Sequence, residues 1–136
     1  MADETRVPIR SDVDIVVARR AGRELGARLG FDSPDLALIA TAISEVARNI
    51  VLYARQGEIL LSQLERGGKR GLLIIAQDQG PGITRIDLAM TDGYSTAGSL
   101  GLGLPGARRM MDEFEITSDL GKGTVVTMRK WVVAPR

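Results

Sequence analysis

The most apolar stretch of the chain, Leu-Leu-Ile-Ile-Ala at residues 72–76, constrains its fold most strongly. An unbroken apolar run of this length predicts a buried strand at the centre of a sheet. Residues 57–65 have strand character as well, and the turn at 67–71 joins them to the strand over 72–77. This pattern predicts a hairpin whose second strand lies at the centre of the sheet.

The other segments predict strands and helices that do not alternate regularly. A second hairpin is expected over 114–119 and 124–133, joined by 120–123, and a short edge strand over 7–10. Start and stop signals predict helices over 12–29 (capped by Ser11 or Asp12 and ended by Gly30), 34–55 and 104–113, with a short one possible at 84–90. Hairpins without βαβ units predict an α+β fold in two layers, a mixed and mostly antiparallel sheet with helices on one face.

Composition limits the function classes. The 136 residues, 44% of them hydrophobic, suffice for one core, so a single domain over 1–136 is expected. The absence of histidine and cysteine excludes a phosphohistidine, a Ser-His-Asp triad, and thiolate or His-ligated metal sites. A net charge of +1 indicates neither nucleic acid nor an anionic membrane as partner. No uninterrupted apolar run approaches ~18 residues and no export signal is evident, so a cytoplasmic protein is expected.

The predicted helix over 34–55 has an unusual third face. At about 100° per residue its side chains sort into three stripes. The core stripe holds Leu36, Ile39, Ala40, Ile43, Val46, Ala47 and Ile50; the solvent stripe holds Thr41, Ser44, Arg48 and Arg55; the third holds Leu38, Ala42, Glu45, Asn49, Leu52 and Tyr53. Glu45 and Asn49 therefore lie one turn apart among apolar neighbours. They either hydrogen-bond locally or form the floor of a ligand pocket, where a carboxylate can be a general base and a carboxamide oxygen can hold Mg²⁺.

Two glycine-containing loops suggest a ligand. Asp78 ends the central strand, and Gly80-Pro81-Gly82 follows it, so a carboxylate acceptor lies beside backbone that a flat ligand can approach. An ordinary tight turn explains the same residues. The run 99–106 matches G-x-G-x-x-G, but the polar residues before it and the lack of a βαβ unit disfavour a dinucleotide fingerprint.

The second loop can still be interpreted as a binding site for phosphate. Gly101 and Gly103 lie just before a helix that has Pro105 in its first turn, and such an N-terminus binds anions. A flexible loop entering a helix is the alternative. The polar, glycine-rich residues between the two loops suit a lid over a nucleotide.

Taken together, the motifs resemble those of a known superfamily. In order and spacing, they resemble the boxes of the superfamily that unites gyrase, histidine kinases and the mismatch-repair ATPases: Ile43 to Asn49, Asp78 to Gly82, Gly101 to Gly103 and Gly121 to Thr124. The small size and the run 104–114 look like the anti-sigma-factor serine/threonine kinases, in particular the RsbT-type stressosome switch kinases. The resemblance implies the Bergerat ATP-binding fold and ATP with Mg²⁺ as cofactors.

The resemblance also implies roles for single residues. Asn49 would ligate Mg²⁺, Glu45 would be the general base toward a protein hydroxyl, and Asp78 would accept the adenine amino group. Gly80 and Gly82 would shape the adenine pocket, Gly101 and Gly103 would line the phosphates, and Thr124 would support Asp78. The cation that neutralises the γ-phosphate stays open among Arg85, Arg108 and Arg109.

The partners follow from the resemblance alone. It implies a Ser or Thr on a STAS-domain protein as substrate, and a metal-dependent protein phosphatase activated when the kinase is released. Two other functions stay open: a nucleotide-gated binding protein with little catalysis, acting as anti-sigma factor or phosphatase activator, and a plain ATP hydrolase.

Overall fold

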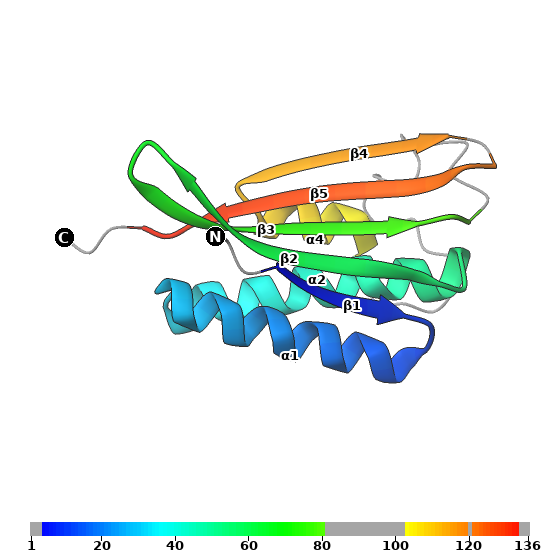
Figure 1. The fold of residues 1–136 in the computed structure, drawn as a ribbon, viewed down its shortest axis with the longest axis horizontal. Helices are drawn as coiled ribbons and strands as arrows, with labels where there is room; N and C mark the ends of the chain where they lie inside the picture. Colours follow the sequence, from blue (N-terminus) through cyan, green and yellow to red (C-terminus); the bar gives the residue numbers. More distant parts are fainter. Residues whose placement is uncertain (1–3, 81–102, 120, 134–136) are drawn as a thin grey trace.

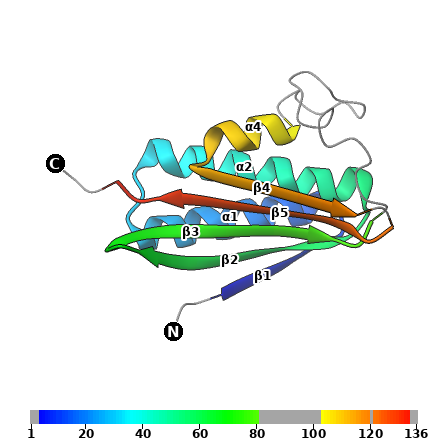
Figure 2. The same ribbon diagram turned by 90° about the horizontal axis from the view of Figure 1, so that it is seen from above.

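A computed structural model of the chain describes residues 4–80, 103–119 and 121–133 (Figure 1). Its elements are β1 (Glu4–Ile9), α1 (Asp12–Leu29), α2 (Ser33–Tyr53), β2 (Gly57–Arg66), β3 (Lys69–Asp78), α4 (Gly103–Met110), β4 (Glu113–Asp119) and β5 (Gly123–Trp131). The strands form one sheet in the order β1-β2-β3-β5-β4, antiparallel at every pairing of the described strands. Figure 2 shows the three helices on one face of this sheet. The predicted two-layer α+β fold is confirmed.

The two long helices begin at the predicted caps, and α1 ends at the predicted glycine. Ser11 holds the N-cap position of α1, and the Asp14 carboxylate accepts a hydrogen bond from the Ser11 N–H at 3.2 Å. Gly30 ends α1 with a φ of 103°, a left-handed conformation that glycine adopts without steric cost. At the start of α2, Asp32 accepts a hydrogen bond from the Asp35 N–H at 2.9 Å. Local capping chemistry therefore positions the helix that carries the predicted catalytic pair.

Several predicted boundaries are wrong: the strand over 7–10 spans Glu4–Ile9, and the strand over 124–133 spans Gly123–Trp131. The helix over 104–113 ends at Met110, because Glu113 already pairs with Arg129 in the β4–β5 ladder. The turn over 67–71 is shorter, because Lys69 pairs with Arg66 at the end of the β2–β3 hairpin. Arg55 lies beyond α2, with a φ of 71°. The helix predicted over 84–90 lies outside the described residues.

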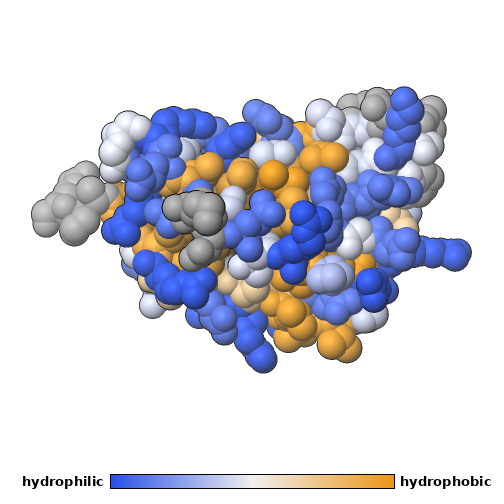
Figure 3. Space-filling model, in the orientation of Figure 1, coloured by the Kyte–Doolittle hydropathy of each residue, from blue (hydrophilic) through white to orange (hydrophobic). Residues whose placement is uncertain are grey.

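The core lies between the sheet and the helices. Its largest fully buried side chains come from β1, α2, β2, β3 and β5: Ile9, Ile39, Ile43, Val46, Ile50, Ile59, Leu61, Leu72, Ile74 and Met128. On α1 the apolar residues Val13, Val16 and Val17 are exposed, 70%, 40% and 49% respectively, and Figure 3 shows apolar surface over that part of the helix. Ile15, Ala18, Gly22 and Leu25 face the core instead. A Cβ on Gly22 would collide with the Ile43 side chain, so this glycine lets α1 pack closely on α2.

By length and composition alone, α2 could cross a membrane, since its apolar window has a mean hydropathy of 1.5. Half of that window is buried inside the fold, as in the core helices of many proteins. The place of α2 between α1, α4 and the sheet therefore accounts for its apolar character.

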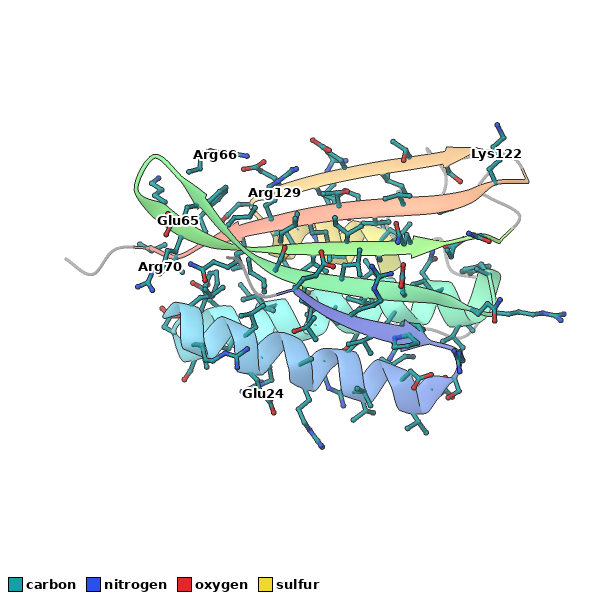
Figure 4. The ribbon with its side chains drawn as sticks, viewed as in Figure 1. Glu24, Glu65, Arg66, Arg70, Lys122 and Arg129 are labelled. Carbon is teal, nitrogen blue, oxygen red and sulfur yellow. The ribbon has the colours of Figure 1, made fainter. Side chains whose placement is uncertain are left out.

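Glu113 is the centre of a charged cluster at the end of the sheet where β2 turns into β3. Its carboxylate accepts hydrogen bonds from the Trp131 indole N–H and from Arg66, both at 2.9 Å, and pairs with Arg129 at 3.4 Å. Figure 4 shows Arg66 and Arg129 near one another, and Lys122 at the opposite end of the sheet. The hydrogen bond from Trp131 is the largest cause that holds the pKa of Glu113 below its ordinary value; the charges of Arg66 and Arg129 add to it, against desolvation.

This cluster predicts a pH-dependent contribution to stability. A carboxyl whose pKa is lower in the folded protein than in the unfolded chain stabilises the fold above both pKa values, and this contribution is lost as pH falls through the folded value. The difference in free energy of unfolding between wild type and Glu113→Gln should be constant from about pH 8 to about pH 6 and shrink below about pH 4.5. Urea titrations across this range measure it, with the exposed carboxylate of Glu24 on α1, as Glu24→Gln, for comparison. A difference that does not change with pH would contradict the cluster's role.

Lys130 is a buried cation that caps the end of α4. Its Nζ donates to the carbonyl of Met110 at 2.9 Å and lies 3.9 Å from Asp35 of α2. Lys130→Met removes that donor and leaves a carbonyl without its partner, so we expect a loss of about 1–3 kcal/mol in the free energy of unfolding. Urea denaturation tests this. Lys69→Met, at an exposed lysine of the β2–β3 turn, should change stability far less.

Candidate functional site

Asp78 lies at the end of the central strand β3 and is held by two loops. Its Oδ1 accepts hydrogen bonds from the Gly80 N–H at 2.9 Å and from the Thr124 N–H at 3.3 Å. Thr124 is 4% exposed, and its hydroxyl hydrogen-bonds to the Ser118 hydroxyl at 2.8 Å. The structure thus brings three of the predicted site residues together: Asp78, Gly80 and Thr124.

The other carboxylate oxygen of Asp78, Oδ2, has no hydrogen-bond partner among the described residues. Because Oδ1 is already engaged by two backbone N–H groups, the orientation of the carboxylate is fixed and Oδ2 is an available acceptor. This arrangement fits a ligand that presents an N–H donor, such as the adenine amino group.

Two glycines allow the close packing around Asp78. A Cβ on Gly80 would lie 2.6 Å from the Cβ of Ala54, where α2 ends. Gly123 has a φ of 101°, and a Cβ there would collide with the carbonyl oxygen of Asp78. No role is predicted for Gly123 from the sequence, although it lies within the glycine motif next to Thr124. It lets the β4–β5 turn touch the end of β3, so that Thr124 reaches Asp78.

Glu45 is buried on α2, with 4% of the residue exposed. Its partner is Arg48, whose Nη1 donates to Oε2 at 3.1 Å and to Oε1 at 3.3 Å. The prediction placed Arg48 in the solvent stripe; its side chain is 29% exposed and folds back onto Glu45. The signal was present in the sequence, because a Glu and an Arg at i and i+3 face each other on a helix.

The prediction for Ser44, in the same solvent stripe, is also wrong. Predicted to face solvent, this residue is 7% exposed, and its hydroxyl donates to the Ala40 carbonyl at 2.8 Å. Because this bond stays within α2, the serine hydroxyl needs no water. The helix is therefore buried over a wider arc than three equal stripes imply, and its exposed apolar side chains are at Leu38, Leu52 and Tyr53.

Asn49 lies one turn beyond Glu45 and is half-buried. Its side-chain amide has no hydrogen bond to any described residue, so its oxygen is available to a ligand. The described residues contain no group of three or more His, Asp or Glu side chains that could hold a metal ion. The donor set therefore fits Mg²⁺ only if phosphate oxygens and water supply the other ligands, which is how Mg²⁺ usually binds with nucleotides.

Gly103 begins α4, with a φ of 53°, and α4 packs against α2. The start of α4 thus lies beside the helix that carries Glu45 and Asn49. The other predicted glycines, Gly82 and Gly101, and the predicted lid lie outside the described residues, as does Arg85 among the candidate cations.

A cleft of about 540 Å³ opens at the Asp78 end of the sheet. Its walls come from β1, β2, β3 and the β4–β5 turn, and include Pro8, Glu58, Gln77 and Lys122. Asp78 touches this cleft, but Glu45 and Asn49 do not line it. In the β2–β3 and β3–β5 ladders Gln77 lies opposite Glu58 and Val125, and these strand residues belong to the face away from the buried side chains. The cleft thus borders the predicted adenine residue Asp78, but neither Glu45 nor Asn49 of α2 belongs to its lining.

This fold and the motifs on it define a class of ATP-binding domain. The chain belongs to the histidine kinase-like ATPase domain family, whose model matches residues 9–130. It is 52% identical to the serine/threonine-protein kinase RsbT of Bacillus subtilis over 132 residues, which cover 97% of this chain and 99% of RsbT. It is also 31% identical to an anti-sigma F factor of a Thermoanaerobacter strain over 121 residues, 85% of this chain and 83% of that protein.

Solved structures agree on the fold. The RsbU and RsbW domains of Rv1364c from Mycobacterium tuberculosis align with 96% of this chain at a TM-score of 0.62 and 23% identity, and this chain covers 32% of that one. The mycobacterial sensor histidine kinase MprB aligns at a TM-score of 0.56 and 12% identity, covering 96% of this chain and 97% of its own. The predicted family and the predicted enzyme class, an ATP-dependent protein serine/threonine kinase, are confirmed by the family match and by RsbT.

Proposed function

We propose that this chain acts as one domain, residues 1–136, that transfers the γ-phosphate of ATP to a Ser or Thr hydroxyl of a STAS-domain antagonist or scaffold protein. The observation that carries the proposal is the arrangement on α2, where the buried carboxylate of Glu45 lies one turn from the amide of Asn49, which has no hydrogen-bond partner among the described residues. A carboxylate so placed can accept a proton, and a carboxamide one turn away can bind the Mg²⁺ of a nucleotide at the same place.

The adenine end of ATP would be held at β3. The free Oδ2 of Asp78 would accept the adenine amino group, with Thr124 behind it and with Gly80 and Gly82 shaping the pocket. This role is supported by the two backbone hydrogen bonds to Oδ1, which leave Oδ2 in a fixed direction. Gly101 and Gly103 would line the phosphates before α4.

The chemistry would take place on α2. Asn49 would hold Mg²⁺, which neutralises phosphate charge. Glu45 would accept the proton of the attacking Ser or Thr hydroxyl as the new oxygen–phosphorus bond forms and ADP departs with the electrons of the broken bond. Burial of Glu45 supports this role, because a base screened from water interacts more strongly with the group it deprotonates.

The proposal extends to a partner-switching module in the cytoplasm. Phosphorylation of the STAS partner would release the kinase, which would then activate a metal-dependent protein phosphatase. A second candidate is a nucleotide-gated binding protein with little catalysis; the similarity to anti-sigma F factors, named for binding rather than for phosphoryl transfer, favours it.

A transfer assay separates the two candidates. Purified protein, a candidate STAS domain and ATP labelled in the γ-phosphate are incubated with and without Mg²⁺, and mass spectrometry locates the label. Mg²⁺-dependent labelling of a single Ser or Thr is expected. Tight ATP-dependent binding of the partner without labelling would support the second candidate. If neither ATP nor ADP raises the melting temperature, nucleotide binding itself is refuted.

A further inference from the structure

Arg48 lies within the motif that runs from Ile43 to Asn49 but has no predicted role there, yet it contacts the proposed base directly. A single nitrogen, Nη1, lies 3.1 Å from Oε2 and 3.3 Å from Oε1 of Glu45, so it bridges both carboxylate oxygens. The contact follows from sequence spacing, since the two residues are at i and i+3 on α2. Arg48 is the only residue among those described that pairs with Glu45.

Burial makes this contact consequential. The Glu45 side chain is 3% exposed, whereas that of Arg48 is 29% exposed. An ionised carboxylate removed from water is strongly destabilised unless a cation or hydrogen-bond donors compensate for the lost hydration. Arg48 supplies that compensation from the side of the helix that remains open to solvent, without being buried itself.

The other elements packed on α2 offer charged groups that do not reach Glu45. The elements concerned are α1, α4, β1, β2 and β3. Arg108 and Arg109 lie on α4 and are exposed. In the described hydrogen bonds of Asp78, at the end of β3, its Oδ1 accepts from the N–H groups of Gly80 and Thr124, not from α2. The described ion pairs of β1 and β2 join their own charged residues to one another or to β4, not to α2. On α1 the charged side chains of Arg20, Arg23 and Glu24 are exposed.

We propose that Arg48 is a positioning residue for phosphoryl transfer: by bridging both oxygens of Glu45, it fixes the plane of the carboxylate toward the substrate hydroxyl. The proposal rests on the proposed function, because it takes Glu45 as the base. Misplacing a catalytic group by about 1 Å can lower the rate by roughly 100-fold. Losing the bridge should therefore reduce turnover rather than nucleotide binding.

The test compares Arg48→Ala with Arg48→Lys and with Arg23→Ala, a matched loss of an exposed arginine on α1. We expect Arg48→Ala to lower kcat by about 10- to 100-fold, with KM for ATP within about twofold of wild type. Arg48→Lys should recover most of the rate, because one ammonium can bridge two oxygens as the single Nη1 does. Guanidinium ion, added below denaturing concentrations, should partly restore Arg48→Ala and leave Arg23→Ala unchanged. Should Arg48→Ala not fold, Arg48→Gln, which keeps one donor, takes its place.

The outcomes separate this proposal from the proposed function. Unchanged kcat in Arg48→Ala, when Glu45→Gln is inactive, would overturn the positioning role and leave the kinase assignment intact. A higher kcat would overturn it too, by showing that Arg48 restrains the base. A loss that neither lysine nor guanidinium recovers, with a lowered melting temperature, would reveal a purely structural role. If Glu45→Gln itself keeps full activity, the proposed role of the base fails first.

Discussion

Replacing Glu45 with glutamine is expected to lower the rate of phosphoryl transfer by about 10²- to 10⁴-fold, the usual contribution of a general base. Glutamine keeps the size of the side chain but cannot accept the proton of the substrate hydroxyl. Because the proposed role of Glu45 concerns the substrate hydroxyl and not the adenine, affinity for ATP should change little. Single-turnover transfer to the proposed STAS-domain partner and ATP titrations followed by melting temperature measure the two quantities separately.

Glu24→Gln is the matched control, since it makes the same change on the exposed face of α1. It should leave both quantities unchanged. Glutamine at position 45 leaves the Arg48 guanidinium without its anionic partner, so the melting temperature without ATP must be measured as well. A folded Glu45→Gln protein that transfers phosphate at the wild-type rate would show that Glu45 is not the base.

The second large effect is expected at Asp78. Asp78→Asn can still accept the Gly80 and Thr124 N–H groups through its amide oxygen, but its NH₂ then replaces the free Oδ2 acceptor. Two donors would face each other at the adenine amino group. Since a hydrogen bond to a charged group contributes about 1.5–3 kcal/mol, affinity for ATP should fall by about 10- to 100-fold.

The same substitution should change base selectivity. Inosine triphosphate carries an oxo group where adenine carries its amino group, and the new NH₂ of Asp78→Asn can donate to it. We therefore expect the variant to bind the inosine nucleotide better than ATP, with the opposite order in wild type. Calorimetric titration of both nucleotides measures this, with Asp12→Asn on α1 as control. Equal losses for both nucleotides would mean that Asp78 supports the fold and does not read the base.

The parts of this molecule that could be predicted from sequence are those with local chemical signals. Ser11, Gly30 and Asp32 bound the helices because caps act within a few residues. The end of the last helix could not be found locally: 111–113 carry no stop signal, and a pairing with Arg129 decides it. Long-range context overrides local pattern at such points.

Side-chain orientation was harder to predict than chain path. Apolar residues of α1 recur at helical spacing at Val13, Val16, Val17, Ala21 and Leu25, yet only Leu25 of these is buried, and Ile15, Ala18 and Gly22 face the core with it. Periodicity alone does not decide between two apolar faces. Arg48 was assigned to solvent by its angle on the helix, because such a projection ignores how a long side chain bends toward a buried charge. The roles of the nucleotide-site residues stay predictions.

The hydrogen bond from the Thr124 N–H to Asp78 joins residues 46 positions apart. It links β3 to its neighbour β5, whose place in the sheet differs from its place in the sequence. Strand β5 lies between β3 and β4, so β3 gains its second neighbour only when the last strand of the sheet arrives. During synthesis, a ribosome-bound chain without β5 has Asp78 and the Gly80 N–H but lacks the Thr124 N–H that completes the fixation of the carboxylate. The ability to bind ATP should thus appear late and abruptly as the chain lengthens. Stalled or truncated products that lack β5 should not compete for nucleotide.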